Sequence, residues 1–437
     1  MSVKKIIAII LGVILLIAVL VVAASAIASS FYSKKNMELA ESFDKVEKED
    51  QLTPEKDENG NWYFVTDREF KIMQLTDIHI GGGWLSAKKD AQALNCIAAM
   101  IAEEKPDLVI ATGDVAFPFP DKAGTLNNLA AAKIFAKLMD KLGVYWTVAF
   151  GNHDTEAYSF YSREKLGKYY MSDELRYCLY TPGPEEVDGY GNQIINVKNS
   201  KGLITQSLIM FDSHSYPGIV DIGGKYDNIH QNQIDWYRKN IQELNSYNAE
   251  VLKTLSSDSL TYLEDTYKNV KSLAFFHIPL REYDTAWSEY ERAGFKNTEN
   301  VKYIYGEKNE NVCCGAEDDE VFETMLELGS TQGVFVGHDH VNNYSIDYKG
   351  IRLTYGLSVD YLAYKDIDKK GDYRGCTMIT TYPDGKFDCR AESYYQDKYT
   401  PKYEKESVIF ENNHNAFFAL FYDIKERVLS YRKNLTV

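Results

Sequence analysis

Side chains that bind metal ions recur in short patches along this chain of 437 residues. The chain has eight histidines, and five of them lie in these patches. The candidate metal ligands are Asp77, His79, Asp114, Asn152, His277, His338 and His340. Carboxylate, imidazole and amide groups together suit divalent metals such as Mn, Fe or Zn. Each patch follows an apolar run, so the sequence predicts a metal site at the ends of strands.

The spacing of the ligands favours two metals rather than one. Asp77 and His79 lie two positions apart, as do His338 and His340, so in an extended segment each pair points to one side. An aspartate such as Asp114 can offer one oxygen to each of two metals. Two metals about 3.5–4 Å apart can hold the attacking and leaving oxygens of a phosphoryl group in line, and they generate hydroxide at neutral pH. The pattern therefore indicates hydrolysis of a phosphate ester.

A purely structural interpretation of the same residues is that they form turns at strand ends, where Asp and Asn cap the chain. It accounts for one or two patches, but not for the clustering of the histidines. The metal interpretation is therefore favoured.

The order of the patches resembles that of the calcineurin-like metallophosphoesterase superfamily. In sequence letters the patches read Asp-x-His, Gly-Asp, Gly-Asn-His-Asp, His and Gly-His-x-His. More narrowly, the chain resembles the purple-acid-phosphatase-related branch of Dcr2-like phosphatases, over about residues 70–395. The resemblance implies an α/β fold: a calcineurin-like four-layer sandwich of two mixed β-sheets flanked by helices.

The resemblance also divides the candidate ligands between two metals that share one aspartate. The first metal would be bound by Asp77, His79, Asp114 and His340. The second metal would be bound by Asp114, Asn152, His277 and His338.

Two neighbouring residues are expected to serve the reaction without binding metal. The resemblance places His153 against the substrate, where it would stabilise the phosphoryl group and protonate the leaving oxygen. An imidazole between cations and an anionic phosphate suits general acid catalysis near neutral pH. Asp154 would either orient His153 or cap the following helix, and the sequence favours neither role.

One position departs from the family pattern. Purple acid phosphatases place a tyrosine ligand three residues after the aspartate of Gly-Asp, and this chain has Phe117 there. A phenyl ring cannot bind a metal. Two divalent ions are therefore expected rather than a ferric–divalent pair, and their identity among Mn, Fe and Zn stays open.

The first residues of the chain predict a membrane segment. Lys4 and Lys5 precede an apolar run over residues 6–28, which is long enough to span a bilayer. The charges favour an N-terminus inside and a catalytic domain outside the cytoplasm. Cleavage as a secretory signal near Ala26 or Ala28 is the alternative, but the run exceeds the usual apolar stretch of such signals. A single-pass anchor is therefore favoured over secretion.

The predicted domain boundaries follow from these features. Residues 1–32 form the signal anchor or signal peptide, 33–69 a polar linker, 70–398 the catalytic domain and 399–437 a C-terminal helical tail. The net charge of −16 repels polyanions, so no nucleic acid partner is expected. The expected substrate is a small phosphorylated molecule, and the sequence predicts neither disulfide pairs nor an oligomeric state.

Alternating apolar patterns position the patches within the predicted domain. Strands are predicted at residues 70–75, 107–111 and 144–150, with helices at 87–104 and 126–142 between them. This order is typical of a largely parallel sheet, whose ligands lie at the carboxyl ends of the strands. Residues 178–213 predict antiparallel strands at the edge of a second sheet. Further elements are expected at residues 203–211, 234–255, 272–276, 333–336 and 352–357.

Three functions are compatible with these observations. A phosphomonoesterase is favoured, because the phosphatase-like branch is the nearest resemblance. A phosphodiesterase acting on a nucleotide, lipid or envelope polymer is the first alternative, since one fold hosts both. The second is a surface binding module on a decayed phosphoesterase scaffold, against which the intact ligand set argues.

Overall fold

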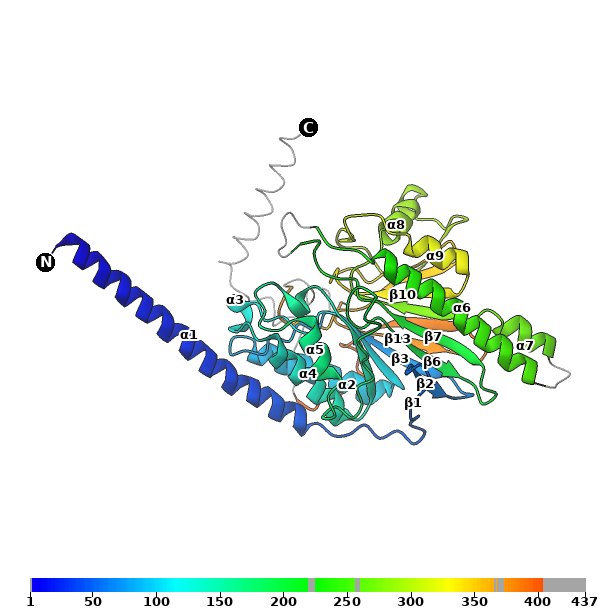
Figure 1. Ribbon diagram of the computed structural model, residues 1–437, viewed down its shortest axis with the longest axis horizontal. Coiled ribbons are helices and arrows are strands. Elements are labelled where there is room, and N and C mark those ends of the chain that lie inside the picture. The colour runs from blue at the N-terminus through cyan, green and yellow to red at the C-terminus, as the bar shows by residue number, and fades with distance from the viewer. Residues whose placement is uncertain (1, 219–224, 256–259, 365–366, 368–372, 404–437) are drawn as a thin grey trace.

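The computed structural model describes residues 2–218, 225–255, 260–364, 367 and 373–403 (Figure 1). Two β-sheets form its centre. The larger has nine strands, in the order β1 (Glu55–Lys56), β2 (Trp62–Val65), β6 (Gln193–Lys198), β7 (Ile204–Met210), β8 (Ser272–Phe275), β10 (Thr331–Val336), β12 (Ile351–Tyr355), β11 (Ser345–Tyr348) and β9 (Val301–Tyr305). The smaller has five, in the order β14 (Phe387–Ser393), β13 (Gly375–Thr381), β3 (Phe70–Leu75), β4 (Leu108–Thr112) and β5 (Tyr145–Ala149).

Apolar side chains fill the space between the two sheets. Phe70 and Ile72 of β3 lie in this inner core beside Leu208 and Phe275 of the larger sheet. Met73, one position along β3, lies in the core on the opposite face of the smaller sheet. This alternation follows from the two-residue period of a strand, and it explains why β3 is apolar on both faces.

Helices cover the outer face of each sheet (Figure 1). On the smaller sheet they are α2 (Ala87–Glu104), α4 (Asn128–Leu142) and α5 (Arg163–Tyr170). On the larger sheet they are α6 (Gln231–Thr254), α8 (Glu282–Arg292) and α9 (Val321–Leu328), with α7 (Leu260–Tyr267) beside α6. The predicted four-layer sandwich of two mixed sheets flanked by helices is confirmed.

Local signals set the ends of α4. The side chain of Asn127 accepts a hydrogen bond from the Ala130 backbone N–H at 3.1 Å, which satisfies one free donor of the first turn. Gly143 ends the helix in the left-handed conformation, with a φ of 70°, and its N–H donates to the carbonyl of Met139 at 3.1 Å.

The strand–helix alternation predicted for residues 70–150 matches β3, α2, β4, α4 and β5, and β3, β4 and β5 run parallel. The antiparallel pair predicted within residues 178–213 is β6 and β7. Its predicted position at the sheet edge is wrong, because β2 pairs with β6 and β8 pairs with β7. The sequence analysis also missed β13, which runs antiparallel to β3.

The polar linker predicted for residues 33–69 is corrected by the structure. Helix α1 (Val3–Ser42) continues without a break from the apolar run into this segment. Ala40 and Phe43 are buried in the same core as α2 and α4, and β2 joins the larger sheet. Most charged side chains of this segment face solvent, whereas Asn36 is buried against the domain, so the polarity of the sequence did not by itself indicate a linker.

The first part of α1 extends away from the sheets (Figure 1). Its most apolar stretch of 18 residues has a mean hydropathy of 3.6 and is not buried against the domain. By length and composition it can cross a membrane or act as a signal sequence. From residue 404 onward, the helical tail predicted for residues 399–437 lies outside the described residues.

Candidate metal centre

The seven predicted ligands lie together where strands of the two sheets end. Two of them follow β3, one follows β4 and one follows β5, while one follows β8 and two follow β10. Because β3, β4 and β5 are parallel, and β8 and β10 are parallel, the carboxyl ends of the strands in each set meet at one edge. Both sheets therefore contribute to one site.

The backbone is strained at four of these ligands. Asp77, His79, Asp114 and His338 have positive φ angles of 49°, 53°, 53° and 76°. They are half of the non-glycine residues with positive φ in the part of the chain that the structure describes. Such a conformation costs of order 1–3 kcal/mol per residue and persists only where the surroundings enforce it. Asp77 and His79 thus reach the same site from a tight turn, not from the predicted extended segment.

Glycines in the patches allow the loops to approach closely. A Cβ atom on Gly113, whose φ is 91°, would lie 2.6 Å from Nδ1 of His277. A Cβ atom on Gly337 would lie 1.8 Å from Oγ1 of Thr76. No side chain fits at these distances, so glycine is required for the ligands of the two sheets to meet.

The first predicted metal group is compact. Nε2 of His79 lies 3.3 Å from Oδ2 of Asp114, and Nε2 of His340 lies 3.3 Å from Oδ1 of Asp77. One ligand atom from each of the four residues lies within 4.8 Å of the others. All four side chains are buried. One cation can therefore contact all four.

The second predicted group adjoins the first through Asp114. Nε2 of His277 lies 3.1 Å from Oδ2 of Asp114 and 3.1 Å from Oδ1 of Asn152. It also lies 3.3 Å from Nδ1 of His338. Oδ2 of Asp114 thus faces a histidine of each group, so Asp114 is the carboxylate that two metals would share.

The donor chemistry of this second group fits a cation. Nδ1 of His277 lies 2.8 Å from the Thr112 carbonyl, an acceptor only, so Nδ1 carries the proton of the neutral ring. Nε2 then presents its lone pair to the oxygens of Asp114 and Asn152, a repulsive contact unless a cation lies between them. Nε2 of His338 is buried without a hydrogen-bond partner in the described part of the chain.

The electrostatics of the protein without metal support this fit. Burial alone would lower the pKa of His277, but the charge and hydrogen bond of Asp114, together with the charge of Asp77, outweigh it and raise that pKa to about 9. Burial alone would raise the pKa of Asp114, but His277 and His153 hold it well below its usual value. A positive charge at this position is therefore strongly favoured, and a metal can supply it in place of the proton.

Stability of the metal-free protein should therefore decrease as the pH rises. The folded-state pKa of His277 exceeds its unfolded value, so its contribution is complete below pH 6.5 and is lost as the pH rises through about 9. The expected loss is about 3 kcal/mol in the free energy of unfolding. Urea unfolding at pH 6 and pH 9 measures it. A loss of the same size with bound metal would contradict this explanation, because the metal replaces the proton.

Asp360, which the sequence analysis missed, fixes two of the predicted ligands. Its Oδ1 lies 3.3 Å from Nδ1 of His79, and its Oδ2 lies 3.2 Å from Nδ1 of His340. Its carboxylate also accepts backbone N–H bonds from Leu362 and Ala363, both at 2.7 Å. Burial would raise the pKa of Asp360, but the charges of His79 and His340 hold it well below its usual value. Asp360 thus orients both rings with Nε2 toward the first group.

Replacing Asp360 with asparagine should weaken metal binding by about 10–100-fold, because loss of such a partner frees both rings. Isothermal titration with Mn or Zn measures the change. Asp388→Asn, which removes a largely exposed carboxylate of β14, is the matched control and should bind metal like the wild type. Equal affinity in both variants would show that Asp360 does not hold the ligands.

His153 lies at the entrance of the site rather than among the ligands. Its side chain is 28% exposed, and its ring centroid lies 5.7 Å from that of His79. Nδ1 of His153 lies 2.7 Å from Oε1 of Glu156, and the hydroxyl of Tyr216 donates to the same oxygen at 3.0 Å. The residue that orients His153 is therefore Glu156, which sequence reasoning did not find.

Both predicted roles of Asp154 are corrected. Its carboxylate accepts backbone N–H bonds from Gly151 at 2.8 Å, Asp114 at 3.0 Å and Ala116 at 2.9 Å. Burial raises its pKa to about 6. The cap of the following helix, α5, is Ser162. Asp154 therefore joins the loops after β4 and β5, and it positions Asp114.

The position of the missing tyrosine ligand is filled by a packed ring. The centroid of Phe117 lies 5.0 Å from that of His79 and 4.9 Å from that of His153. Burial raises the pKa of the nearby Tyr216, so its phenol stays protonated. Nε2 of His214 donates to Oε1 of Gln233 at 2.9 Å, and its ring stacks on that of His230 with a centroid distance of 4.0 Å, so His214 has a structural role.

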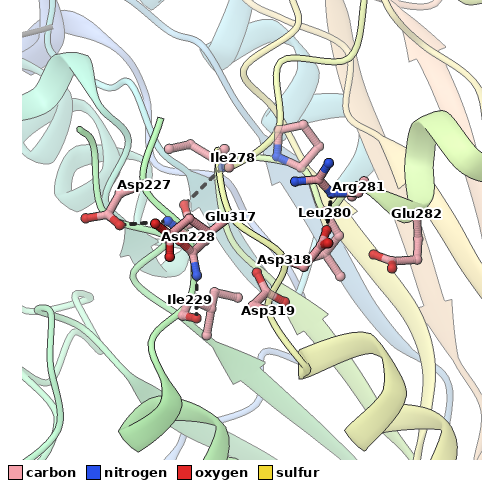
Figure 2. Close-up of a pocket in the computed structure, with 13 residues that line it drawn as sticks. Asp227, Asn228, Ile229, Ile278, Leu280, Arg281, Glu282, Glu317, Asp318 and Asp319 are labelled. Carbon is pink, nitrogen blue, oxygen red and sulfur yellow. Dashed lines mark hydrogen bonds and ion pairs between the residues drawn. The ribbon is translucent and has the colours of Figure 1, made fainter. Parts of the chain in front are cut away.

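A separate pocket adjoins the loop after His277 (Figure 2). The hydroxyl of Ser213, in its lining, accepts the backbone N–H of His277 at 3.3 Å. The charged residues of the lining are Arg281, Asp227, Glu282, Glu317, Asp318 and Asp319. Burial raises the pKa of Glu282 to about 7. Carboxylates predominate in this pocket, so its charge disfavours an anionic phosphoryl group.

Comparison with known proteins agrees with this geometry. The model of the calcineurin-like phosphoesterase family matches residues 70–342. The chain is 28% identical over 326 residues to the Arabidopsis thaliana protein named "Probable inactive purple acid phosphatase 14", covering 70% of this chain and 74% of that protein. It is also 28% identical over 297 residues to "Phosphatase DCR2" of Saccharomyces cerevisiae, covering 64% of this chain and 45% of that protein.

Among solved structures, a dimetal phosphatase from Danio rerio aligns with 12% identity and a TM-score of 0.42, covering 72% of this chain and 94% of that one. The family match spans more than half of the chain and includes every predicted ligand, from Asp77 to His340. The chain therefore belongs to the calcineurin-like phosphoesterases, hydrolases of phosphate esters with a dinuclear metal centre.

Proposed function

We propose that the protein hydrolyses phosphomonoesters outside the cytoplasm, with two divalent metals bound by the seven predicted ligands. The observation that supports this most is the position of Asp114 Oδ2, which lies 3.3 Å from Nε2 of His79 and 3.1 Å from Nε2 of His277. This atom can serve both metals at once, and the remaining ligands divide around it into the two groups described above.

The residues around the metal ligands have separate tasks in this reaction. When bound, the two metals supply Lewis acidity and neutralise charge on the phosphoryl group. His153, at the entrance, donates a proton from its ring to the leaving oxygen. Glu156 holds that ring through Nδ1, so Nε2 is the atom that faces the substrate. Phe117 packs beside His153 and excludes water from this side.

His153→Ala should slow hydrolysis according to the leaving group. An alkyl phosphate needs protonation of its leaving oxygen, so we expect a loss of about 100-fold or more in kcat. p-Nitrophenolate leaves without a proton, so the loss on p-nitrophenyl phosphate should stay below about tenfold. Steady-state kinetics on both substrates measure this, and the activated ester is the internal control. Equal losses on the two esters would argue against a general acid role for His153.

The choice between monoester and diester can be tested directly. The full chain in detergent, with Mn, Fe or Zn added, would be assayed on p-nitrophenyl phosphate beside bis-p-nitrophenyl phosphate. Turnover of the monoester that disappears in Asp114→Asn would support the phosphomonoesterase. A preference for the diester would replace it with a phosphodiesterase acting on a nucleotide, lipid or envelope polymer.

The word "inactive" in the name of the Arabidopsis relative raises a second candidate. It is a surface binding module on a decayed phosphoesterase scaffold. The complete set of ligands, with their atoms 3.1–3.3 Å apart in the pairs given above, favours an active centre instead. Bound metal without turnover on either ester would favour the binding module.

The proposed location outside the cytoplasm depends on whether α1 stays attached to the catalytic domain as a membrane anchor. Ser25 and Ser29 lie on either side of the two cleavage positions considered from the sequence, and both hydroxyls donate to the Gly124 carbonyl, at 2.9 and 2.8 Å. Cleavage near Ala26 or Ala28 would remove part of this contact with the catalytic domain. The contact therefore supports a retained membrane anchor over a secreted protein.

A further inference from the structure

We propose that the substrate is a phosphomonoester carried by a membrane lipid, whose apolar chains stay in the bilayer that α1 enters. This proposal rests on the phosphomonoesterase function proposed above and adds the class of substrate. It is argued from three observations: where the apolar run of α1 ends, what joins that point to His153, and which side chains are exposed around the entrance.

The apolar run of α1 ends at the level of the catalytic domain. At 1.5 Å per residue, residues 6–28 span about 34 Å, close to the roughly 30 Å of bilayer hydrocarbon. Ser25, in the last turns of this run, accepts a hydrogen bond from Nε1 of Trp84 at 2.9 Å. Tyr32 follows one turn after the run. Trp and Tyr favour the bilayer surface, so the surface lies at Trp84 and at Gly124, which Ser25 and Ser29 contact.

A short helix joins this level to the active site. Helix α3 (Pro120–Ala123) ends at Gly124 and lies beside α1 (Figure 1). Phe119 precedes it, and its ring centroid lies 5.8 Å from that of Phe117. Phe117 in turn lies 4.9 Å from His153. A row of aromatic rings therefore leads from the predicted membrane surface to the residue that faces the phosphate.

Apolar side chains are exposed along this route. Trp84, Leu85 and Phe119 are 41%, 44% and 36% exposed, and the backbone N–H of Leu85 donates to the Ala123 carbonyl of α3 at 3.2 Å. On another side of the site, the ring of Tyr364 lies 5.0 Å from that of His340. Apolar side chains around the entrance of the site gain nothing from a soluble phosphate ester, whereas they can contact the apolar chains of a lipid.

The reaction on such a substrate is an ordinary hydrolysis. A bond forms between phosphorus and the oxygen of water, and the bond between phosphorus and the ester oxygen breaks. Water gives up one proton to the solvent, the ester oxygen gains one from His153, and His153 regains its proton from the solvent. The products are inorganic phosphate and a lipid alcohol, and no oxidant or second substrate is needed.

The test uses the full chain, loaded with Mn, in phosphatidylcholine vesicles. Phosphate release from dioleoyl phosphatidate in the same vesicles is compared with release from soluble glycerol 3-phosphate. We expect kcat/KM at least 100-fold higher for the vesicle substrate. Trp84→Ser and Phe119→Ser should each lower the ratio of phosphatidate to p-nitrophenyl phosphate turnover by at least tenfold, and the second activity in that ratio reports correct folding.

The control is Phe295→Ser, which removes an exposed aromatic side chain just after α8, on the helix layer of the larger sheet. The ratio of phosphatidate to p-nitrophenyl phosphate turnover in this variant should equal that of the wild type. Turnover of p-nitrophenyl phosphate without a preference for phosphatidate would overturn the lipid substrate and leave the phosphomonoesterase intact. Loss of turnover on every ester would overturn both the lipid substrate and the phosphomonoesterase function. A mature protein that begins after Ala26 or Ala28 would also overturn the lipid substrate, because it lacks the anchor.

Discussion

Replacing Asp114 with asparagine is expected to lower kcat/KM for a phosphomonoester by roughly a thousandfold, or about 4 kcal/mol of transition-state stabilisation. Oδ2 of Asp114 lies between His79 and His277, so the change removes the charge that both metal groups share. An amide of the same shape has no charge, so it cannot offset the positive charge of two divalent ions. Steady-state kinetics on p-nitrophenyl phosphate, together with metal analysis of the purified protein, measure both consequences.

The matched control for this change is Asp388→Asn, which makes the same chemical substitution at a largely exposed position. It should keep wild-type kcat/KM and metal content. Circular dichroism distinguishes loss of the site from loss of the fold, because Asp114 also accepts the backbone N–H of His153 at 2.8 Å. A well-folded Asp114→Asn protein with more than a tenth of wild-type activity would contradict the bridging role.

Removal of the metals should abolish turnover and lower the melting temperature by about 5 °C, since binding at 100 times Kd contributes about 2.7 kcal/mol per site. Nε2 of His277 lies 3.1 Å from the oxygens of Asp114 and Asn152, so without metal these groups depend on a proton of His277 to hold them together. Differential scanning calorimetry with and without a chelator measures the shift, and added metal should restore both activity and stability.

The same chelation on Asp114→Asn is the control for metal removal. That variant should show little shift, because it has already lost the shared ligand. A wild-type protein whose melting temperature is unchanged by the chelator would remove the support for a metal centre. It would then favour the binding module on a decayed scaffold.

The sequence predicted the central elements well because their signals are local. An apolar run of strand length, followed by a glycine or a polar patch, identifies a buried parallel strand and its carboxyl end. Helix α2 is predicted at the bounds that the structure gives, Ala87–Glu104, because amphipathic periodicity needs only neighbouring residues. These two patterns were sufficient to place every candidate ligand at the end of a strand.

The residues that the sequence analysis missed depend on distant parts of the chain. Asp360 follows the mixed apolar and polar residues 356–359 after β12, its partners are His79 and His340, and a lone Asp carries no spacing signal. Glu156 replaces Asp154 as the partner of His153, because a turn of 3₁₀ helix, His153–Thr155, directs the two carboxylates differently. The docking of α1 depends likewise on Asn36, Ala40 and Phe43 meeting a surface formed elsewhere.

By itself, the sequence determined the class of fold, the family, the likeness to a two-metal site and the set of candidate ligands, because residue types and strand ends carry that information. Only the tertiary structure decided how those ligands face one another, that Asp360 and Glu156 support them, and that α1 continues into the domain beside the site entrance. The physical reason is distance along the chain: Asp77 and Ser358 are in contact although they lie 281 positions apart, and only packing brings such residues together.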